Sequence, residues 1–334
     1  MALCEVRVPT YKRPDLLKRA LQSLTAQTYN NWKCVVLDDS PTQEARSVVE
    51  SLNDDRMIYQ PHPTNLGRTK NLDYAFFSTN YIGGLYAFVL EDDNYLFPAF
   101  IAENIQSLET NNVNIVLRNA EIRLQTNEAS IPTGETNSGK WYTQGIYNPF
   151  EIYARLFFCE GITNSGLFWR TDTIQSNLQV GAQVKDALHQ ELFRSLRIKE
   201  LIYYEPKPLC VFTLFETHDQ LAKKSGLAKK LDLIQYRRGV QSILVYLVNK
   251  YGHEIVQKAQ DIALVTESEY VLENRLLEAF YLNYEFKKIK KFKAINILVR
   301  HFLRALILLD PYKMMYDKYR PLSSFRPPTA IHRR

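Results

Sequence analysis

The chain has 334 residues, enough for about two domains with a substantial buried core, so a small scaffold stapled by disulfides is excluded. Hydrophobic residues make up 46% and charged residues 23% of the chain, which excludes disordered and collagen-like classes. The four cysteines lie far apart with no CxxC pair, so neither a structural zinc site nor a disulfide framework is indicated, and a reducing compartment is favoured. No apolar run is long enough for a signal peptide or a transmembrane helix, and we therefore expect a cytoplasmic protein.

The net charge of +6 is concentrated at one end of the chain. Residues 287–334 carry 13 Lys or Arg and two Asp, a balance of +11, whereas residues 1–286 carry 29 basic and 34 acidic residues, a balance of −5. This asymmetry indicates that the tail, and not the whole protein, faces an anionic surface.

Strand and helix patterns alternate over residues 1–100. A short strand is expected at residues 5–9, followed by a helix with Pro14 in its first turn and apolar residues at positions 17, 20, 21 and 24. Two continuous apolar runs, at residues 34–37 and 86–90, end in the sequences DDS (38–40) and EDD (91–93). Such runs are typical of buried parallel strands, and ligands of parallel sheets bind beyond the carboxyl ends of the strands. Both acidic clusters are therefore predicted to lie at one binding edge.

The pattern after residue 100 is less regular. We expect a helix after Pro98, a strand at 113–124, a loop in the polar segment 126–141, a loop entering a strand at 162–169, a helix at 187–197 and two short strands at 201–212, separated at Pro206 and Pro208. Beyond residue 226 the apolar spacing is helical, with helices expected at 227–251, 254–265, 269–286 and 292–309.

Several common catalytic signatures are absent from the sequence: GxxxxGK[ST], GxGxxG after the first strand, GxSxG and HExxH. Kinase, dehydrogenase, hydrolase and zincin functions are therefore disfavoured. One acidic pair after a strand is commonly a loop or a helix N-cap, but two clusters at one edge indicate a ligand site. Since carboxylates repel phosphates, acids beside a nucleotide diphosphate require a divalent cation, and Mg²⁺ or Mn²⁺ needs only one or two protein carboxylates there.

Five segments resemble the motifs of family 2 glycosyltransferases of GT-A fold in order and spacing: VPTYKRP (8–14), LTAQTY (24–29), VVLDDS (35–40), NLGR (65–68) and EDD (91–93). The resemblance is strongest over residues 6–93 and continues more weakly to about residue 219. It implies an α/β fold with a Rossmann-like, mostly parallel sheet flanked by helices. In this arrangement residues 1–100 bind the nucleotide sugar, residues 101–225 bind the acceptor, and residues 226–334 form a helical C-terminal region.

The activity implied by the resemblance is that of a metal-dependent, inverting hexosyltransferase. Such an enzyme moves a sugar from a nucleotide diphosphate donor, here expected to be a UDP-sugar, to a hydroxyl of a glycan or a lipid-linked glycan. One alternative is a sugar nucleotidyltransferase, although the glycine-rich first loop of that class is missing after Val8. A second alternative is a catalytically silent nucleotide-sugar-binding module with a membrane- or nucleic-acid-binding tail. Candidate ligand residues are present at every family position, which argues against a catalytically silent protein. Of the two partners for the tail, nucleic acid is the less expected.

The resemblance also assigns residues to the donor site. The residues expected to line the nucleoside are Pro9, Thr10 and Tyr11, and the base or ribose is expected to contact Asp38 or Asp39. The remaining candidates for contact with the nucleotide are Arg13, Arg68, Glu91 and Asp92. Asp93 falls in the metal-binding position of the family's DxD element, with Glu91 where an aspartate is more usual. His218 is a second candidate ligand for Mn²⁺ or Mg²⁺, with a polar surface role as the alternative.

Inversion needs a general base that takes the proton of the acceptor hydroxyl, and the resemblance places this base near the start of a helix in the second half. Asp186 is the first candidate, with Glu191 and His189 behind it. Each has a structural alternative: Asp186 as an N-cap, Glu191 on a solvated helix face, and His189 as a partly exposed polar residue.

Acceptor contacts are expected from two further segments. The small-residue loop with Asn164, Ser165 and Gly166 resembles the segment that shapes the acceptor site, or else is a structural turn. Trp141 either stacks on a sugar or has a core or lid role.

The basic tail combines a lysine cluster at 287–293 with an apolar stretch at 294–309 that polar residues interrupt. This composition is too polar to span a bilayer and suits a helix that lies in the membrane interface. Residues 287–320 are therefore expected to attach the protein to an anionic membrane surface on its inner face, near a lipid-linked acceptor. The alternative is that the helix packs on the catalytic domain.

Overall fold

In the computed structural model, the described residues are 1–126, 129–181, 187–215 and 226–280. The chain divides into two compact units. The first comprises Met1–Pro149 and Ile162–His218, and the second comprises Phe150–Gly161 and Asp219–Arg334. The short stretch Phe150–Gly161 therefore belongs with the C-terminal helices, although the first unit surrounds it in sequence.

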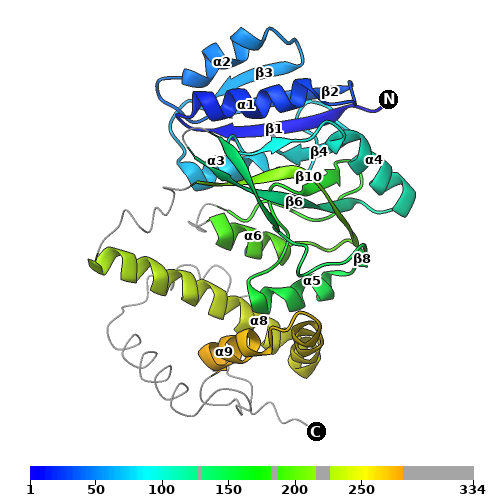
Figure 1. The fold of residues 1–334 in the computed structure, drawn as a ribbon, viewed down its shortest axis with the longest axis vertical. Coiled ribbons are helices and arrows are strands. Elements are labelled where there is room, and N and C mark those ends of the chain that lie inside the picture. The colour runs from blue at the N-terminus through cyan, green and yellow to red at the C-terminus, as the bar shows by residue number, and fades with distance from the viewer. Residues whose placement is uncertain (127–128, 182–186, 216–225, 281–334) are drawn as a thin grey trace. The chain divides into compact units, whose positions relative to one another are not determined.

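The first unit is built on one mixed sheet (Figure 1). Its described strands are β1 (Cys4–Thr10), β2 (Trp32–Asp38), β3 (Met57–Pro61), β4 (Tyr86–Val89), β5 (Tyr95–Leu96), β6 (Ile115–Gln125), β7 (Ser130–Thr136), β8 (Gly145–Tyr147), β9 (Leu167–Arg170) and β10 (Ile202–Phe215). The order is β3-β2-β1-β4-β9-β6-β10-β5, with β7 paired to β6 and β8 paired to β10. Strands β3, β2, β1 and β4 are parallel, as are β6 and β10, whereas β9 is antiparallel to both of its neighbours.

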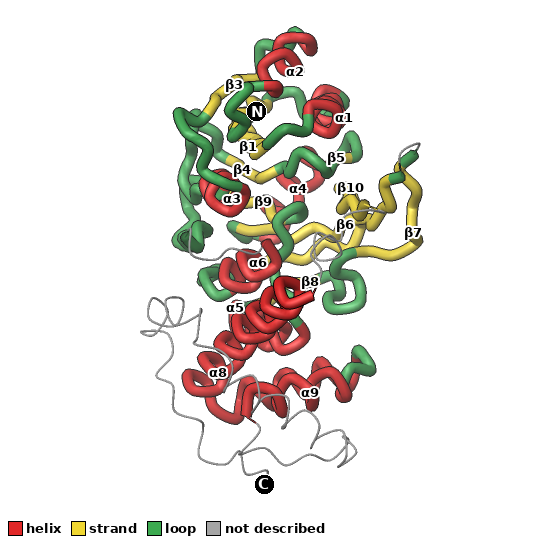
Figure 2. Tube along the Cα trace, turned by 90° about the vertical axis from the view of Figure 1, so that its left-hand side faces the viewer, coloured by secondary structure: helices red, strands yellow, loops and turns green. Residues whose placement is uncertain are grey.

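Helices flank the parallel part of this sheet. They include α1 (Pro14–Thr25), α2 (Glu44–Leu52), α3 (Arg68–Ala75) and α4 (Phe100–Asn111), whereas α6 (Ala187–Ser195) contacts α3. Figure 2 shows α1 and α3 on opposite sides of β1 and β4. The expected α/β architecture with a mostly parallel central sheet is confirmed.

The sequence explains why the first helix and the parallel strands form. Helix α1 begins at Pro14, whose fixed φ suits the first helical turn, and it buries Leu17, Leu21 and Leu24 along one face. Six of the seven residues of β2 and all four residues of β4 are buried, as expected for strands that are covered on both faces. Polar residues directly follow each buried run, which fixes the acidic clusters at the edge of the sheet.

Two sequence predictions for the first unit were wrong. The loop expected at 126–141 contains β7, which pairs antiparallel with β6 and extends to one side in Figure 2. Its side chains are mostly exposed, so backbone pairing holds the strand and no apolar alternation marks it in the sequence. The two short strands expected at 201–212 are a single strand, β10. Its register with β6 shifts between Glu205 and Cys210, and this bulge accommodates Pro206 and Pro208.

The second unit is helical over its described residues. Helix α5 (Pro149–Arg155) leads into the 3₁₀ turn η1 (Leu156–Phe158), which packs against α8 (Gly226–Val265) and α9 (Glu269–Phe280). The Lys258 Nζ donates to Glu151 Oε1 at 2.8 Å. Helix α8 is interrupted at Gly252, with φ 63° and ψ −138°, which confirms the break expected after residue 251.

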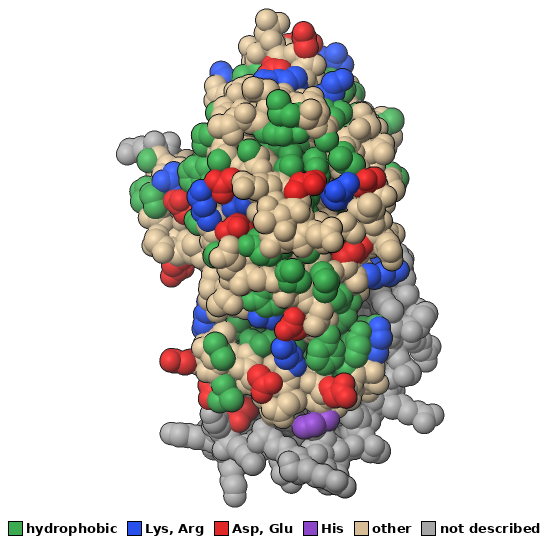
Figure 3. Space-filling view, turned by 90° about the vertical axis from the view of Figure 1, so that its right-hand side faces the viewer, with side chains coloured by type: hydrophobic (Ala, Val, Ile, Leu, Met, Phe, Trp, Pro, Cys, Tyr) green, Lys and Arg blue, Asp and Glu red, His purple; other side chains and the backbone are tan. Residues whose placement is uncertain are grey.

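The face of the molecule drawn in Figure 3 has mixed charge. Acidic and basic side chains are interspersed there with apolar and other polar ones. This matches the near balance of charge in residues 1–286. None of the described helices has the length and apolar character needed to cross a membrane. The basic segment 287–320 lies outside the described residues.

Candidate active site

Three parallel strands end at one edge of the sheet and bring the two acidic clusters together. The register of β1 and β2 places Thr10 beside Asp38, and β4 lies on the other side of β1. Thr10 Oγ1 donates to Asp92 Oδ2 at 2.8 Å, so the β4 cluster touches the end of β1 directly. On the other side, the Lys12 N–H donates to Ser40 Oγ at 2.8 Å. The predicted convergence of both acidic clusters at one edge of the sheet is confirmed.

Asp39 holds the loop that leads into α3. Its side chain is buried and accepts hydrogen bonds from the N–H groups of Leu66 and Gly67, at 2.6 and 2.9 Å, and from Asn65 Nδ2 at 3.0 Å. Gly67 has a φ of 84°, a conformation that favours glycine, directly before the first residue of α3. Asp39 therefore shapes the NLGR segment.

The Asp38 carboxylate is also hydrogen-bonded within the protein. It accepts hydrogen bonds from the Ser40 N–H at 2.8 Å and from Tyr59 Oη at 2.9 Å. Burial and the Asp38 carboxylate raise the pKa of Tyr59 to about 12, so the phenol stays a donor. Sequence analysis missed Tyr59, because its role depends on the pairing of β3 with β2. Of the other nucleoside candidates, Pro9 is buried within β1, whereas Tyr11 is 43% exposed and can meet a ligand.

Arg13 is the counter-ion of the β4 cluster. Its Nη1 lies 3.1 Å from Asp92 Oδ1 and 2.7 Å from Asp93 Oδ2. Arg19 of α1 adds a donor, since its Nη2 donates to the Asp93 backbone oxygen at 2.6 Å. The sequence singled out Arg13 as a nucleotide contact, whereas Arg19 was missed. The amphipathic spacing of α1 could have indicated that Arg19 belongs to the helix but not where its side chain reaches.

Crowding of carboxylates makes this cluster electrostatically costly. Burial and the neighbouring Asp93 and Glu191 carboxylates raise the pKa of Glu91 to about 8, and Arg68 partly opposes the shift. Burial and Asp93 raise the pKa of Asp92 to about 6, against the stabilising effect of Arg13. Arg68 is exposed at the first residue of α3. The arginines therefore offset only part of the burial and mutual repulsion that disfavour the charged forms of Glu91 and Asp92.

A divalent cation fits this excess of carboxylate oxygen. Among the described residues, no group of three or more His, Cys, Asp or Glu side chains is arranged to hold a metal ion. A Mg²⁺ or Mn²⁺ ion that also binds a diphosphate needs only one or two protein carboxylates, and these ions prefer oxygen ligands. The Asp93 side chain, 23% exposed at the sheet edge, has this chemistry. His218 lies outside the described residues.

Helix α6 carries two of the three candidate bases. His189 is 2% exposed, and Glu191 Oε1 accepts the Asn164 N–H at 2.7 Å. The Glu191 carboxylate contributes to the raised pKa of Glu91, which indicates that α6 lies close to the β4 cluster. Asp186, the first candidate of the sequence analysis, lies outside the described residues.

The acceptor candidates are placed in two regions. Asn164 and Ser165 are buried beside α6 and β9. Gly166 is tightly packed, because an added Cβ would lie 2.0 Å from the Arg118 backbone oxygen. Trp141 is half-buried with Lys140 Nζ 5.1 Å from its ring centroid. Gly166 thus has a structural reason to be glycine.

This chain is similar in fold to a solved structure and in sequence to named glycosyltransferases. The crystal structure of S. aureus TarS 1-349 in complex with UDP-GlcNAc shares the fold, with a TM-score of 0.53 over 96% of this chain and 88% of that chain at 17% sequence identity. WcaA of Escherichia coli (strain K12), a glycosyl transferase named for colanic acid biosynthesis, is 30% identical over 100 residues, 29% of this chain and 34% of the relative. GalNAc(5)-diNAcBac-PP-undecaprenol beta-1,3-glucosyltransferase of Campylobacter jejuni is 28% identical over 113 residues, 32% of this chain and 34% of the relative. Each match to these two relatives spans about a third of the relative's length.

The mixed α/β sheet with its flanking helices has the GT-A-like architecture of its structural neighbour TarS. Residues 5–163 match the glycosyl transferase family 2 domain. All five motifs singled out in the sequence lie within this matched segment, which is similar to family 2 glycosyltransferases.

Proposed function

We propose that this chain is a metal-dependent, inverting transferase that moves a sugar from a UDP-sugar to a hydroxyl of a glycan or lipid-linked glycan. The observation that carries the proposal is the β4 carboxylate cluster, which lies at the carboxyl ends of the parallel strands of a family 2 domain and is faced by Arg13. A UDP-sugar is favoured because TarS, which shares the fold, is described in complex with UDP-GlcNAc.

In this proposal the nucleotide lies over the ends of β1, β2 and β4. Tyr11, exposed on the turn after β1, contacts the nucleoside, and Arg68 at the start of α3 approaches the diphosphate. Asp39 acts on the nucleotide through the loop that it holds, because its own carboxylate is occupied by that loop.

Asp93 would hold Mg²⁺ or Mn²⁺, with His218 as a further candidate ligand. When bound, such a cation offsets the charge that develops on the leaving diphosphate. Arg13 pairs with one oxygen of Asp93 and one of Asp92, and so holds both carboxylates at the edge where Asp93 would meet the cation.

A base on α6 or directly before it takes the proton of the acceptor hydroxyl, which attacks the sugar opposite the leaving diphosphate. Asp186 remains the first candidate. His189 is buried, and Glu191 accepts the Asn164 N–H, so the fold itself already engages both side chains.

A lipid-linked acceptor is supported by the Campylobacter jejuni relative, whose name includes an undecaprenol diphosphate glycan. Attachment of the basic segment 287–320 to the anionic inner face of a membrane would bring the enzyme to such an acceptor. We therefore propose that the protein acts in the cytoplasm, peripheral to the membrane.

A donor panel tests the proposal. The full chain is incubated with Mn²⁺ and a set of UDP-, GDP- and dTDP-sugars, and release of the nucleoside diphosphate by slow hydrolysis is measured. We expect release from at least one UDP-sugar and calorimetric binding of UDP. Absence of both UDP binding and UDP release would contradict the proposal, and release of pyrophosphate would favour a nucleotidyltransferase instead.

A further inference from the structure

Helices α3 and α6 are joined by two polar pairs that are spaced one turn apart on each helix. Gln190 Nε2 donates to the Thr69 backbone oxygen at 2.9 Å, and Arg194 Nη2 lies 3.5 Å from Asp73 Oδ1. Residues four apart share a helix face, so both pairs lie along one seam. We call these four residues the α3–α6 clamp.

Arg194 is the buried centre of the clamp. Its side chain is fully buried, its Nε donates to the Leu178 oxygen at 2.8 Å, and its Nη1 donates to Asn164 Oδ1 at 2.5 Å. The guanidinium carbon lies 3.5 Å from the ring centroid of Phe76, just beyond the end of α3. Burial lowers the pKa of Arg194 to about 10, which leaves it charged at neutral pH. A buried cation of this kind depends on its anionic partner.

Asp73 is that partner, and it also binds backbone. Its two carboxylate oxygens accept the N–H groups of Val180 and Gly181, each at 2.8 Å. Leu178 is fixed on both sides, because its N–H donates to Ser78 Oγ at 2.8 Å and its oxygen accepts from Arg194. The chain is thus anchored directly before the segment that contains Asp186.

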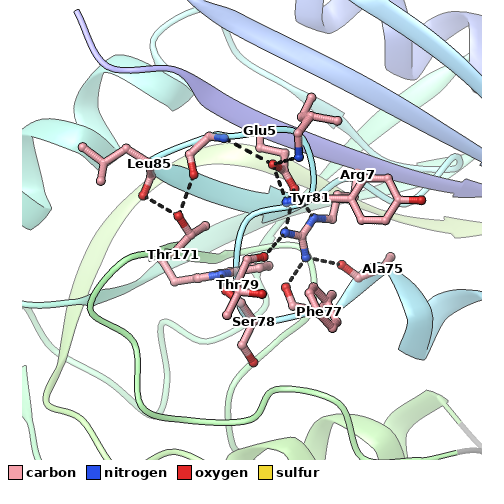
Figure 4. Close-up of polar contacts among 12 residues, drawn as sticks. Glu5, Arg7, Ala75, Phe77, Ser78, Thr79, Tyr81, Leu85 and Thr171 are labelled. Atoms are coloured by element: carbon pink, nitrogen blue, oxygen red, sulfur yellow. Dashed lines mark hydrogen bonds and ion pairs between the residues drawn. The ribbon is translucent and has the colours of Figure 1, made fainter.

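The loop that carries Ser78 is itself anchored to β1. Figure 4 shows the Arg7 guanidinium directed at this loop, where it donates to the backbone oxygens of Ala75, Phe77 and Thr79. The Glu5 carboxylate accepts the N–H groups of Tyr81 and Ile82, both at 2.8 Å. Through Ser78, the segment at 178–181 is therefore connected to β1, the first strand of the sheet.

The other end of α3 belongs to the donor edge. Asn71 Nδ2 donates to the backbone oxygens of Thr10 and Leu37, both at 3.2 Å, where β1 and β2 end. The residues directly before α3 are held by Asp39. One short helix therefore contacts the strand ends of the donor edge and, through the clamp, the helix that carries or follows the candidate bases.

We propose that Asp73 and Arg194 are positioning residues for glycosyl transfer. Both side chains are buried, so neither is proposed to contact the donor. The clamp sets the position of α6, and with it the general base, relative to the donor edge. The catalytic consequence of the clamp rests on the proposed function. Misplacement of a catalytic group by about 1 Å costs about 100-fold in rate, so loss of the clamp is expected to lower turnover without weakening nucleotide binding.

The test compares Asp73→Asn, Arg194→Gln, their double variant and Gln190→Met with the wild-type full chain. Asp172→Asn is the matched control, because Asp172 pairs with Arg170 at 3.2 Å on the surface and away from the clamp. Gln190→Met retains the buried ion pair. It also removes Gln190 Oε1, a buried atom without a hydrogen-bond partner among the described residues, so this variant is expected to fold.

Steady-state UDP release from UDP-GlcNAc with Mn²⁺ gives kcat and KM, and hydrogen–deuterium exchange reports the backbone. We expect kcat to fall about 10- to 100-fold in Asp73→Asn and in Arg194→Gln. The kcat of the double variant should be no lower than that of the less active single variant, because the two residues act as one unit. Gln190→Met should lose about threefold, as for one hydrogen bond. KM and UDP affinity should stay within about twofold, and exchange should rise in peptides covering 178–181 and 187–195 but not in β1–β4.

Three results would overturn the proposal: unchanged kcat in an active protein, a loss of kcat that adds fully in the double variant, or unchanged exchange in 178–181 and 187–195. The exchange measurement needs no activity. If the wild type bound no UDP and released none from any donor, the proposed function would fail, and the exchange data alone would then decide whether Asp73 and Arg194 hold α6.

Discussion

Replacing Arg7 with methionine is expected to destabilise the first unit by about 3 kcal/mol. Arg7 and Glu5 on β1 are 1% and 0% exposed and form an ion pair of 2.7 Å (Figure 4). The guanidinium also donates to three backbone oxygens of the segment 75–79. The variant therefore leaves a buried carboxylate without its counter-ion and three carbonyl groups without a donor.

The magnitude follows from what the variant leaves in place. Removing one partner of a buried ion pair costs about 3–5 kcal/mol, because an uncompensated charge remains buried. Glu5 keeps the Tyr81 and Ile82 N–H groups as donors, which places the expected cost at the lower end of this range. Domains are stable by about 5–15 kcal/mol, so the variant should still fold.

Urea unfolding followed by tryptophan fluorescence measures this effect, since all three tryptophans (Trp32, Trp141 and Trp169) belong to the first unit. Arg170→Met is the matched control. Arg170 pairs with Asp172 across the same two-residue spacing, but the side chains are 27% and 43% exposed, so the cost should stay below about 1 kcal/mol. Adding Glu5→Gln to Arg7→Met should recover part of the loss, because no charge is then buried. Equal losses in Arg7→Met and Arg170→Met, or no recovery in the double variant, would refute the reasoning.

Asp186→Asn should lower turnover at least about 100-fold while calorimetric UDP affinity stays within about twofold, and full turnover would exclude Asp186 as the base. Gly166→Ala should cost about 2 kcal/mol or more in the urea titration, because its Cβ would lie 2.0 Å from the Arg118 oxygen; an unchanged midpoint would contradict this contact. Changing the lysines at 287, 288, 290 and 291 to glutamate should abolish salt-sensitive co-sedimentation with anionic liposomes. Equal, salt-independent behaviour of both proteins would leave only a packing role for the tail.

The donor edge could be predicted from the sequence because its signal is local. Continuous apolar runs encode buried parallel strands, and the acids that follow them must lie at the carboxyl edge, as the Thr10–Asp92 hydrogen bond confirms. The segment that matches the glycosyl transferase family 2 domain, residues 5–163, contains the same motifs. The kink of α8 was also local, since Gly252 interrupts a helical pattern.

The partners of buried charges could not be predicted, because they are set by packing between distant segments. Arg7 alternates with apolar residues in β1 like any exposed strand residue, yet it faces the loop after α3. Arg194 reads as the basic end of an amphipathic helix, yet it is buried against Asp73, 121 positions earlier. The strand β7 escaped detection for a different reason, because an exposed edge strand needs no apolar alternation.

The central claim is that transfer from a UDP-sugar depends on a cation held by Asp93. The most direct test is the rate of UDP release from UDP-GlcNAc by the full chain with Mn²⁺, compared between the wild type, Asp93→Asn and the surface control Asp172→Asn. The account predicts a loss of at least about 100-fold in Asp93→Asn, a comparable loss in EDTA, and no change in the control. Release by Asp93→Asn at the wild-type rate, or undiminished release in EDTA, would contradict it.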